Sequence, residues 1–210
     1  MARGRFITLE GIEGVGKSSH VSAMIESLAA HGREAIATRE PGGSPFADRI
    51  RSLLIDPAGD APSADTELLL VFAARAEHLA RRILPALEGG QWVVCDRFTD
   101  ATYAYQGGGR GIAAERIAVV EDWVQGGFRP DRTLLLDAPV AQALERARGR
   151  GPADRFEREA TAFFERARAV YLERARREPE RFRVIDASQP LEAVRAAVLA
   201  AIGDIEARDD

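Results

Sequence analysis

The first apolar run of the chain is followed by Gly11-Ile12-Glu13-Gly14-Val15-Gly16-Lys17-Ser18, and then by Ser19 and a segment of helical periodicity. This loop matches the pattern GxxxxGK[ST], in which glycines let backbone N–H groups surround phosphate oxygens. Lys17 is the only lysine of the chain. In such loops the lysine reaches the β- and γ-phosphates, the serine hydroxyl binds Mg²⁺, and the helix dipole adds positive potential. The loop therefore predicts a nucleoside-triphosphate site, and the alternative is an ordinary glycine-rich turn.

Composition restricts the class of protein. The 210 residues are 46% hydrophobic and 30% charged, which is enough for one globular domain over residues 1–210. A formal net charge of −4 argues against a nucleic-acid-binding surface, because affinity for polymer phosphates depends on clustered cations. The single cysteine, Cys95, excludes an internal disulfide. The sequence shows no signal peptide and no membrane span, so we expect a cytoplasmic protein.

Apolar runs alternate with segments of helical periodicity. This alternation predicts an α/β fold of three layers, with a parallel sheet covered by helices on both faces. The strand-like runs lie near residues 5–10, 34–38, 91–95, 132–137 and 181–185, and helical spacing is clearest in 22–30, 66–87 and 190–205. Ligands of such sheets bind at the carboxyl ends of the strands. Three polar motifs occupy such positions: Arg39-Glu40-Pro41-Gly42-Gly43, Asp96-Arg97-Phe98 and Asp137.

Asp96 is a candidate for the metal side of the site. It ends the apolar run Val93-Val94-Cys95, and a carboxylate at that position commonly orients Mg²⁺ and its waters near a phosphate-binding loop. Capping of the next helix is the alternative role. We favour the metal role because Arg97 would then direct a guanidinium group at the same phosphates.

A basic segment, Glu145-Arg146-Ala147-Arg148-Gly149-Arg150-Gly151-Pro152, lies between two helical patterns. Its glycines, followed by Asp154-Arg155, indicate a mobile lid at about 146–158 rather than a stable exposed helix. Arginines in a lid, here Arg146, Arg148 and Arg150, can neutralise the charge on a transferring phosphoryl group. A solvated run of charges is the alternative interpretation.

Several motifs in one order carry a resemblance to a known family. After the phosphate-binding loop and Arg39-Glu40-Pro41-Gly42-Gly43 come Phe72-Ala73-Ala74-Arg75, Asp96-Arg97-Phe98 and Ala104-Tyr105-Gln106-Gly107-Gly108-Gly109-Arg110-Gly111. Each motif alone is weak, but the set resembles bacterial members of the thymidylate kinase family over almost the whole chain. The resemblance implies ATP-dependent phosphorylation of dTMP to dTDP by direct in-line transfer with Mg²⁺. It also implies a P-loop NTPase-type fold with a five-stranded parallel sheet, and a homodimer packed through helices.

The resemblance implies roles at the base of the acceptor nucleotide. Phe72 would stack on the thymine ring, and Arg75 would donate a hydrogen bond to an exocyclic oxygen. Thr102 and Gln106 match positions near the base. Phe72 also lies in the apolar run 68–72, which is equally typical of an ordinary core.

Further roles concern the phosphate and the sugar of the acceptor. Arg39, in the motif that also contains Pro41, and Arg97 match positions that hold the acceptor phosphate. Tyr105 matches an aromatic residue that crowds the 2′ position and would exclude ribose. Glu13, an acid among phosphate-binding amides, would contact the 3′-hydroxyl group or its associated water and metal. The loop 12–15 lacks a basic residue, so the chain resembles the type that keeps its catalytic arginine in the lid.

Two positions are less well defined by the resemblance. The segment Asp186-Ala187-Ser188-Gln189-Pro190 matches the loop that approaches adenine. Tyr103 stands where the family has a smaller or an amide side chain, which affects the expected base contacts. Two other functions remain open at this stage: a kinase for another deoxynucleotide or nucleoside, and a regulator that binds ATP without transferring phosphate. Phe72 and Arg75 are the pair that discriminates between the kinases.

Overall fold

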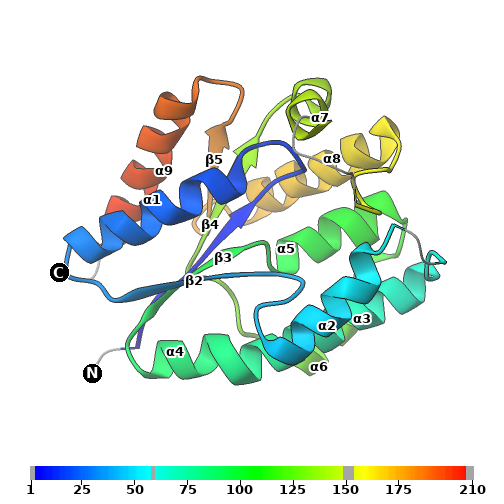
Figure 1. The fold of residues 1–210 in the computed structure, drawn as a ribbon, viewed down its shortest axis with the longest axis horizontal. Coiled ribbons are helices and arrows are strands. Elements are labelled where there is room, and N and C mark those ends of the chain that lie inside the picture. The colour runs from blue at the N-terminus through cyan, green and yellow to red at the C-terminus, as the bar shows by residue number, and fades with distance from the viewer. Residues whose placement is uncertain (1–2, 58–59, 149–153, 207–210) are drawn as a thin grey trace.

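Five parallel strands form the centre of the molecule, in the order β2-β3-β1-β4-β5. The structure is a computed structural model that describes residues 3–57, 60–148 and 154–206 (Figure 1). The strands are β1 (Phe6–Glu10), β2 (Ala35–Arg39), β3 (Trp92–Asp96), β4 (Arg132–Asp137) and β5 (Phe182–Asp186). Each lies within a residue or two of a predicted run, so the predicted parallel sheet is confirmed. The three inner strands, β1, β3 and β4, are buried along nearly their whole length, which explains their apolar runs.

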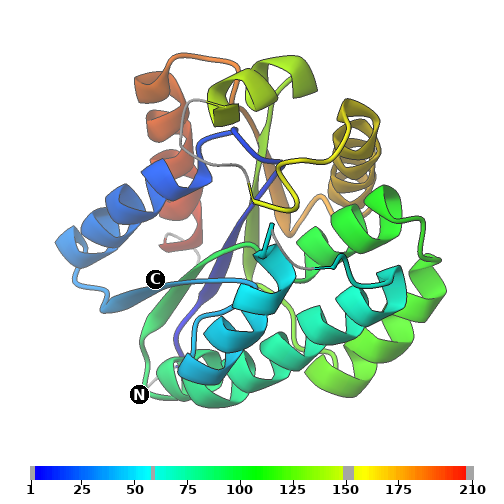
Figure 2. The ribbon, with the colours of Figure 1, turned by 45° about the vertical axis from the view of Figure 1, so that its right-hand side comes forward.

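Helices cover both faces of this sheet. Figure 2 shows α1 (Lys17–Ala30) and α9 (Leu191–Glu206) on one side, and α8 (Thr161–Arg177) with the helical segments of residues 64–88 and 99–125 on the other. Alternate side chains of β1 serve the two layers: Ile7 and Leu9 pack with α1 and α9, whereas Phe6 packs with Phe98. The predicted three-layer arrangement is therefore present. Among the described residues, no helix has the length and apolar character needed to cross a membrane.

The helices between β2 and β3 carry much of the pocket wall. They are α2 (Pro45–Ile55), α3 (Ala64–His78), a π-helical turn (Leu79–Ile83) and α4 (Leu84–Glu88). Ser44 caps α2 by accepting a hydrogen bond from the N–H of Ala47, and Pro45 starts the helix. The predicted helix over 66–87 is thus a longer segment with a π turn near Pro85, which has no N–H to donate.

Two more regions complete the chain. After β3 come α5 (Thr99–Thr102), a π-helical segment (Tyr103–Gly109) and α6 (Ala114–Gln125), and after β4 comes α7 (Val140–Arg148). We expected a mobile lid to begin at about residue 146. Instead, Arg146 and Arg148 belong to the regular helix α7. Val140 and Ala143 are buried on one side of this helix, and their packing keeps it regular up to Arg148. Arg150 lies outside the described residues.

Candidate active site

The phosphate-binding loop joins β1 to α1 at the carboxyl edge of the sheet. Gly14 and Gly16 have φ angles of 78° and 93°, which side chains rarely adopt. A Cβ atom at Gly14 would lie 1.7 Å from the carbonyl oxygen of Ala143, so only glycine lets the loop approach α7. No side chain caps the N-terminus of α1. Its first N–H groups are therefore available to an anion.

Lys17 lies over this loop. Its ammonium group donates hydrogen bonds to the carbonyl oxygens of Gly11 and Ile12, at 2.9 and 2.8 Å. Burial, and then repulsion by Arg97, lowers its pKa to about 8. A polyphosphate bound next to the ammonium group would favour its charged form and reverse this shift.

Ser18 and Asp96 meet beside the loop. The Ser18 hydroxyl donates to Asp96 Oδ2 at 3.0 Å, while the buried Asp96 Oδ1 has no hydrogen-bond partner. Hydroxyl and carboxylate oxygens are ligands that Mg²⁺ prefers, and Mg²⁺ commonly takes its other ligands from phosphate and water. Within the described ranges, no cluster of three or more His, Cys, Asp or Glu residues could hold a metal. The residues therefore fit an ion that is bound together with a nucleotide.

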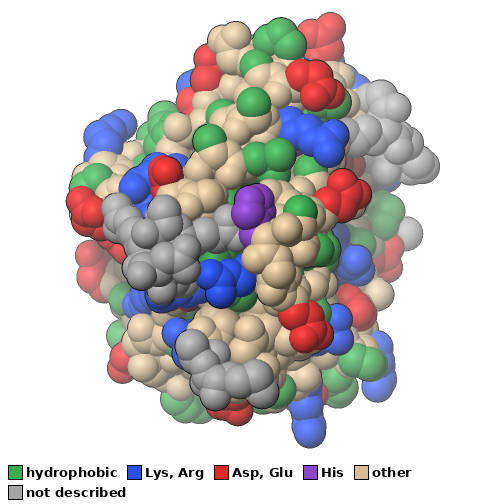
Figure 3. Space-filling model, turned by 90° about the vertical axis from the view of Figure 1, so that its left-hand side faces the viewer, with side chains coloured by type: hydrophobic (Ala, Val, Ile, Leu, Met, Phe, Trp, Pro, Cys, Tyr) green, Lys and Arg blue, Asp and Glu red, His purple; other side chains and the backbone are tan. Residues whose placement is uncertain are grey.

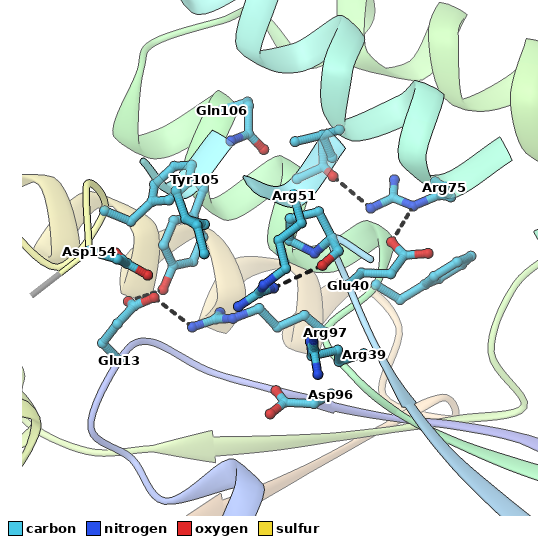
Figure 4. A pocket seen from close by; sticks show the side chains of 17 residues that line it. Glu13, Arg39, Glu40, Arg51, Arg75, Asp96, Arg97, Tyr105, Gln106 and Asp154 are labelled. Carbon is cyan, nitrogen blue, oxygen red and sulfur yellow. Dashed lines mark hydrogen bonds and ion pairs between the residues drawn. The ribbon is translucent and has the colours of Figure 1, made fainter. Parts of the chain in front are cut away.

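A pocket opens next to Asp96, and three of the four arginines that line it lie on this side. Figure 4 shows Arg39, Arg51 and Arg97 gathered on the side of the pocket near Asp96. Arg51 donates to the carbonyl oxygen of Pro41 at 2.8 Å, and Arg39 lies 3.4 Å from Asp48. Burial, followed by repulsion from Arg39, lowers the pKa of Arg51. Such a group of cations is arranged to receive an anion.

Arg97 connects the pocket with the phosphate-binding loop. It has a φ of 72°, which is unusual for a residue other than glycine and is common at functional sites. Its guanidinium group donates to Gly11 O and Glu13 Oε1, both at 2.8 Å, and lies 4.8 Å from the centre of the Tyr105 ring. The Tyr105 hydroxyl donates to the other oxygen of Glu13. Burial opposes the charge, but Tyr105 and Glu13 raise the pKa of Arg97 above its ordinary value.

The opposite end of the pocket is built around Arg75. This side chain is buried, and it donates to Glu40 Oε2 at 2.7 Å and to Thr102 Oγ1 at 2.9 Å. The other oxygen of Glu40 lies 3.0 Å from Nδ1 of His78. Sequence reasoning assigned no role to Glu40 or His78. The available signals were the position of Glu40 in the motif after β2 and the spacing of His78, one helical turn after Arg75.

Phe72 is not among the residues that line this pocket, whereas Val71 and Phe98 are. Val71 and Phe72, four and three residues before Arg75, lie on opposite sides of it around α3. Val71 is on the side that faces the pocket, and Phe72 is on the side that faces the core. Phe72 is buried in a cluster with Tyr103, and the Arg75 guanidinium group lies 4.8 Å from its ring centre. It therefore supports Arg75 from behind.

Arg51 is another pocket residue that our sequence analysis missed. It lies in the middle of α2, within a stretch that matches no motif, and only the approach of α2 to the end of β2 brings it to Arg97. Pro41, Thr102, Tyr105 and Gln106 line the same pocket. These four residues were expected near the acceptor nucleotide.

Arg146 is bound elsewhere in this conformation. It donates to the carbonyl oxygens of Ala187 and Ser188, at 2.7 and 3.4 Å, and so connects α7 to the loop 186–190 that follows β5. Arg148 and Glu13 line a second, neighbouring pocket. The cationic end of α7 thus lies close to the phosphate-binding loop, although Arg146 itself contacts the loop after β5.

Two positions singled out in the sequence are engaged away from the main pocket. The Tyr103 hydroxyl donates to Glu121 at 2.6 Å, so this side chain does not enter the pocket. Asp137 forms a bidentate ion pair with Arg168 at 2.7 and 2.9 Å. The first contact joins the segment Tyr103–Gly109 to α6, and the second joins the end of β4 to α8.

Comparison with known proteins identifies the family. A sequence model of the thymidylate kinase family matches residues 9–198. A thymidylate kinase of Alkalilimnicola ehrlichii is 58% identical over 99% of this chain and 96% of that protein, and one of Pseudomonas putida is 57% identical over 98% of both. The crystal structure of a thymidylate kinase from Ehrlichia chaffeensis superposes with a TM-score of 0.75, at 30% identity over 95% of this chain and 99% of that one. The chain therefore belongs to the thymidylate kinase family.

Proposed function

We propose that this chain transfers the γ-phosphoryl group of ATP directly to dTMP, with ATP on the phosphate-binding loop and dTMP in the pocket that Arg39, Arg51 and Arg97 line. Membership of the thymidylate kinase family makes ATP the phosphoryl donor and dTMP the acceptor. The observation that supports the placement best is the position of Arg97. Its guanidinium group contacts Gly11 of the loop and also lines the arginine pocket, so one side chain lies between donor and acceptor. The comparisons do not favour the alternative kinases or an ATP-binding regulator.

On the donor side, the backbone N–H groups from Gly14 to Ser19 surround the phosphates, and Lys17 binds the β- and γ-phosphates. Ser18 and Asp96 would hold Mg²⁺ that is bound with ATP. When bound, the ion neutralises charge on the phosphates. Arg146 and Arg148 add cations at the end of α7, and Arg146 would have to leave Ala187 and Ser188 to reach the phosphates.

On the acceptor side, Arg39, Arg51 and Arg97 hold the phosphate of dTMP. Charge-assisted contacts of this kind position the acceptor oxygen for attack on the γ-phosphorus and stabilise the charge of the transition state. Tyr105 and Glu13, which are hydrogen-bonded to each other, lie where the sugar would pass between phosphate and base. Tyr105 then excludes a 2′-hydroxyl group and Glu13 contacts the 3′-hydroxyl group.

The base of dTMP occupies the end of the pocket that contains Arg75, Thr102 and Gln106. Arg75 is held by Glu40 and backed by Phe72, so its orientation is fixed before the base arrives. The pocket wall on this side includes Val71 and Phe98, which supply apolar contact to the ring. We therefore propose that Phe72 acts indirectly, by packing behind Arg75, and does not itself stack on the thymine ring.

A homodimer is supported by exposed apolar side chains on two adjacent helices. Leu69 on α3 and Val119 and Trp123 on α6 are 56%, 72% and 85% exposed. Exposed apolar groups of this size on neighbouring helices are typical of an interface. On the side of the molecule at the left of Figure 1, by contrast, the described hydrophobic side chains are scattered among charged ones (Figure 3).

An acceptor panel tests this function. Purified protein with ATP and Mg²⁺ should form ADP far faster with dTMP than with dCMP, dGMP or UMP, measured in a coupled assay. A Lys17→Ala variant should lose turnover with every acceptor. Equal rates with all four nucleotides would contradict thymine specificity, and unchanged turnover in the variant would contradict the assignment of the donor loop.

A further inference from the structure

Glu67 is a buried carboxylate on α3 that joins three segments of the chain. It accepts hydrogen bonds from Gln106 Nε2 at 2.9 Å, from Arg155 Nη2 at 2.7 Å and from Arg110 Nε at 3.2 Å to each of its oxygens. The side chain has no solvent exposure. Gln106 lines the main pocket, whereas Arg155 lies in the second half of the predicted lid and donates to the carbonyl oxygen of Leu54 in α2.

Two guanidinium groups form ion pairs with Glu67, and a carboxylate in such pairs only accepts hydrogen bonds. Gln106 must therefore turn its amide nitrogen toward Glu67. This fixes the amide without reference to how its oxygen and nitrogen were assigned, because the reverse orientation would place two acceptors together. Among the described residues, Gln106 Oε1 accepts no hydrogen bond, so this oxygen is left for a ligand in the pocket that Gln106 lines (Figure 4).

We propose that Glu67 is a positioning residue that sets the hydrogen-bond polarity of the base pocket, and that it selects thymine over cytosine through Gln106. The proposal rests on the function proposed above, because it requires the base to lie beside Gln106 and Arg75. Thymine presents an N3–H donor between two carbonyl acceptors. Gln106 Oε1 matches the donor, and Arg75 matches a carbonyl.

Cytosine has the opposite pattern on the same edge. Its N3 is an acceptor and its exocyclic amine is a donor. The N3 acceptor would therefore face the acceptor Gln106 Oε1, and the amine donor would face the donor groups of Arg75. A pocket that leaves buried polar groups unpaired discriminates strongly against such a ligand. Discrimination therefore depends on Gln106 keeping its orientation, and this orientation depends on the charge of Glu67.

The oxygens of Glu67 divide their partners in a way that makes the proposal testable. Oε2 contacts Arg155 Nη2 and Arg110 Nη2, at 2.7 and 3.1 Å, whereas Oε1 accepts from Gln106; the Arg110 Nε group, at 3.2 Å from each oxygen, is shared between the two. In a Glu67→Gln variant the one remaining oxygen should stay with the arginines, which carry only donors. The new amide nitrogen then faces Gln106 as a donor. Gln106 has to turn its oxygen toward this donor, which leaves its nitrogen facing the pocket.

The experiment compares kcat/KM for dTMP with kcat/KM for dCMP. Glu67→Gln should lower the ratio of the two at least about tenfold, as expected when a buried hydrogen bond of reversed polarity replaces a matched one. Gln106→Met, which leaves the ion pairs of Glu67 in place, should also lower the ratio. In the double variant, Glu67→Gln should have no further effect on the ratio, because Glu67 acts through Gln106.

Arg155→Gln is the matched control. It removes one cation from Glu67 but leaves an acceptor-only carboxylate beside Gln106, so the ratio should stay unchanged whatever happens to kcat. An unchanged ratio in Gln106→Met would overturn the proposal even if Glu67→Gln does not fold. An effect of Glu67→Gln that persists without Gln106 would overturn it as well. If the wild-type protein does not phosphorylate dTMP, the function fails instead, and the two failures are distinguishable.

Discussion

Replacing Arg51 by methionine separates binding of the acceptor phosphate from stability of the fold. Arg51 shares its pocket with Arg39 and Arg97, and burial followed by repulsion from Arg39 lowers its pKa. The nucleotide-free protein therefore holds these cations close together at a cost. Binding of the dTMP phosphate would convert this cost into a favourable interaction.

The expected loss of affinity follows from the contacts. A hydrogen bond to a charged group contributes about 1.5–3 kcal/mol. Arg51 is only half-buried and two other arginines remain, so we expect the lower limit, which corresponds to a roughly tenfold weaker Kd for dTMP. The free energy of unfolding should change by less than about 1 kcal/mol, because the lost hydrogen bond to Pro41 O is offset by relief of repulsion.

Titration calorimetry with dTMP and with thymidine, which lacks the phosphate, isolates the phosphate term. Arg51→Met should weaken dTMP binding and leave thymidine binding unchanged. Arg49→Met, on the exposed side of the same helix, serves as the control and should change neither. Equal losses for dTMP and thymidine, or no loss for dTMP, would refute the assignment of Arg51 to the phosphate.

Three further predictions concern protonation and assembly. Because burial lowers the pKa of Lys17 to about 8, ATP binding near pH 8 should take up protons, which calorimetry in buffers of different ionisation enthalpy measures; no uptake would contradict the Lys17 contact. Burial and then Asp100 raise the pKa of Glu10 from 4.5 to about 7. The folded state therefore binds more protons than the unfolded state in this interval, and this contribution to stability falls as pH rises. The melting temperature of a Glu10→Gln variant, minus that of the wild type, should therefore increase as the pH rises from 5 to 8. A difference that does not change with pH would contradict the raised pKa of Glu10. Trp123→Glu should shift the protein from dimer to monomer in sedimentation experiments, and an unchanged mass would exclude α6 from the interface.

The sheet and the phosphate-binding loop could be predicted because their signals are local. Continuous apolar runs mark strands that are buried on both faces, and the glycines of the loop are required by backbone geometry. The end of α7 was less predictable. The arginines suggested an exposed flexible segment, but burial of Val140 and Ala143 on the other side of the helix continues it to Arg148.

The acceptor pocket shows what local signals cannot provide. Choosing between Val71 and Phe72 required the rotation of α3 about its axis, which depends on packing against α2 and α6. Arg51 shares a pocket with Arg97 only because the fold brings the middle of α2 to the segment that follows β2. Glu40 and Glu67 act through other side chains. Glu40 is 35 residues from its partner Arg75 in the sequence, and Glu67 is 39 residues from its partner Gln106. Contacts over such separations have no signature in a single sequence.

A crystal structure with dTMP and a non-hydrolysable ATP analogue tests the central claim most directly. We predict that the phosphate of dTMP lies within about 3 Å of nitrogen atoms of Arg51 and Arg97, and that the terminal phosphate of the analogue faces it from the side of Lys17. An acceptor phosphate bound outside the pocket of Arg39, Arg51 and Arg97 would contradict the account.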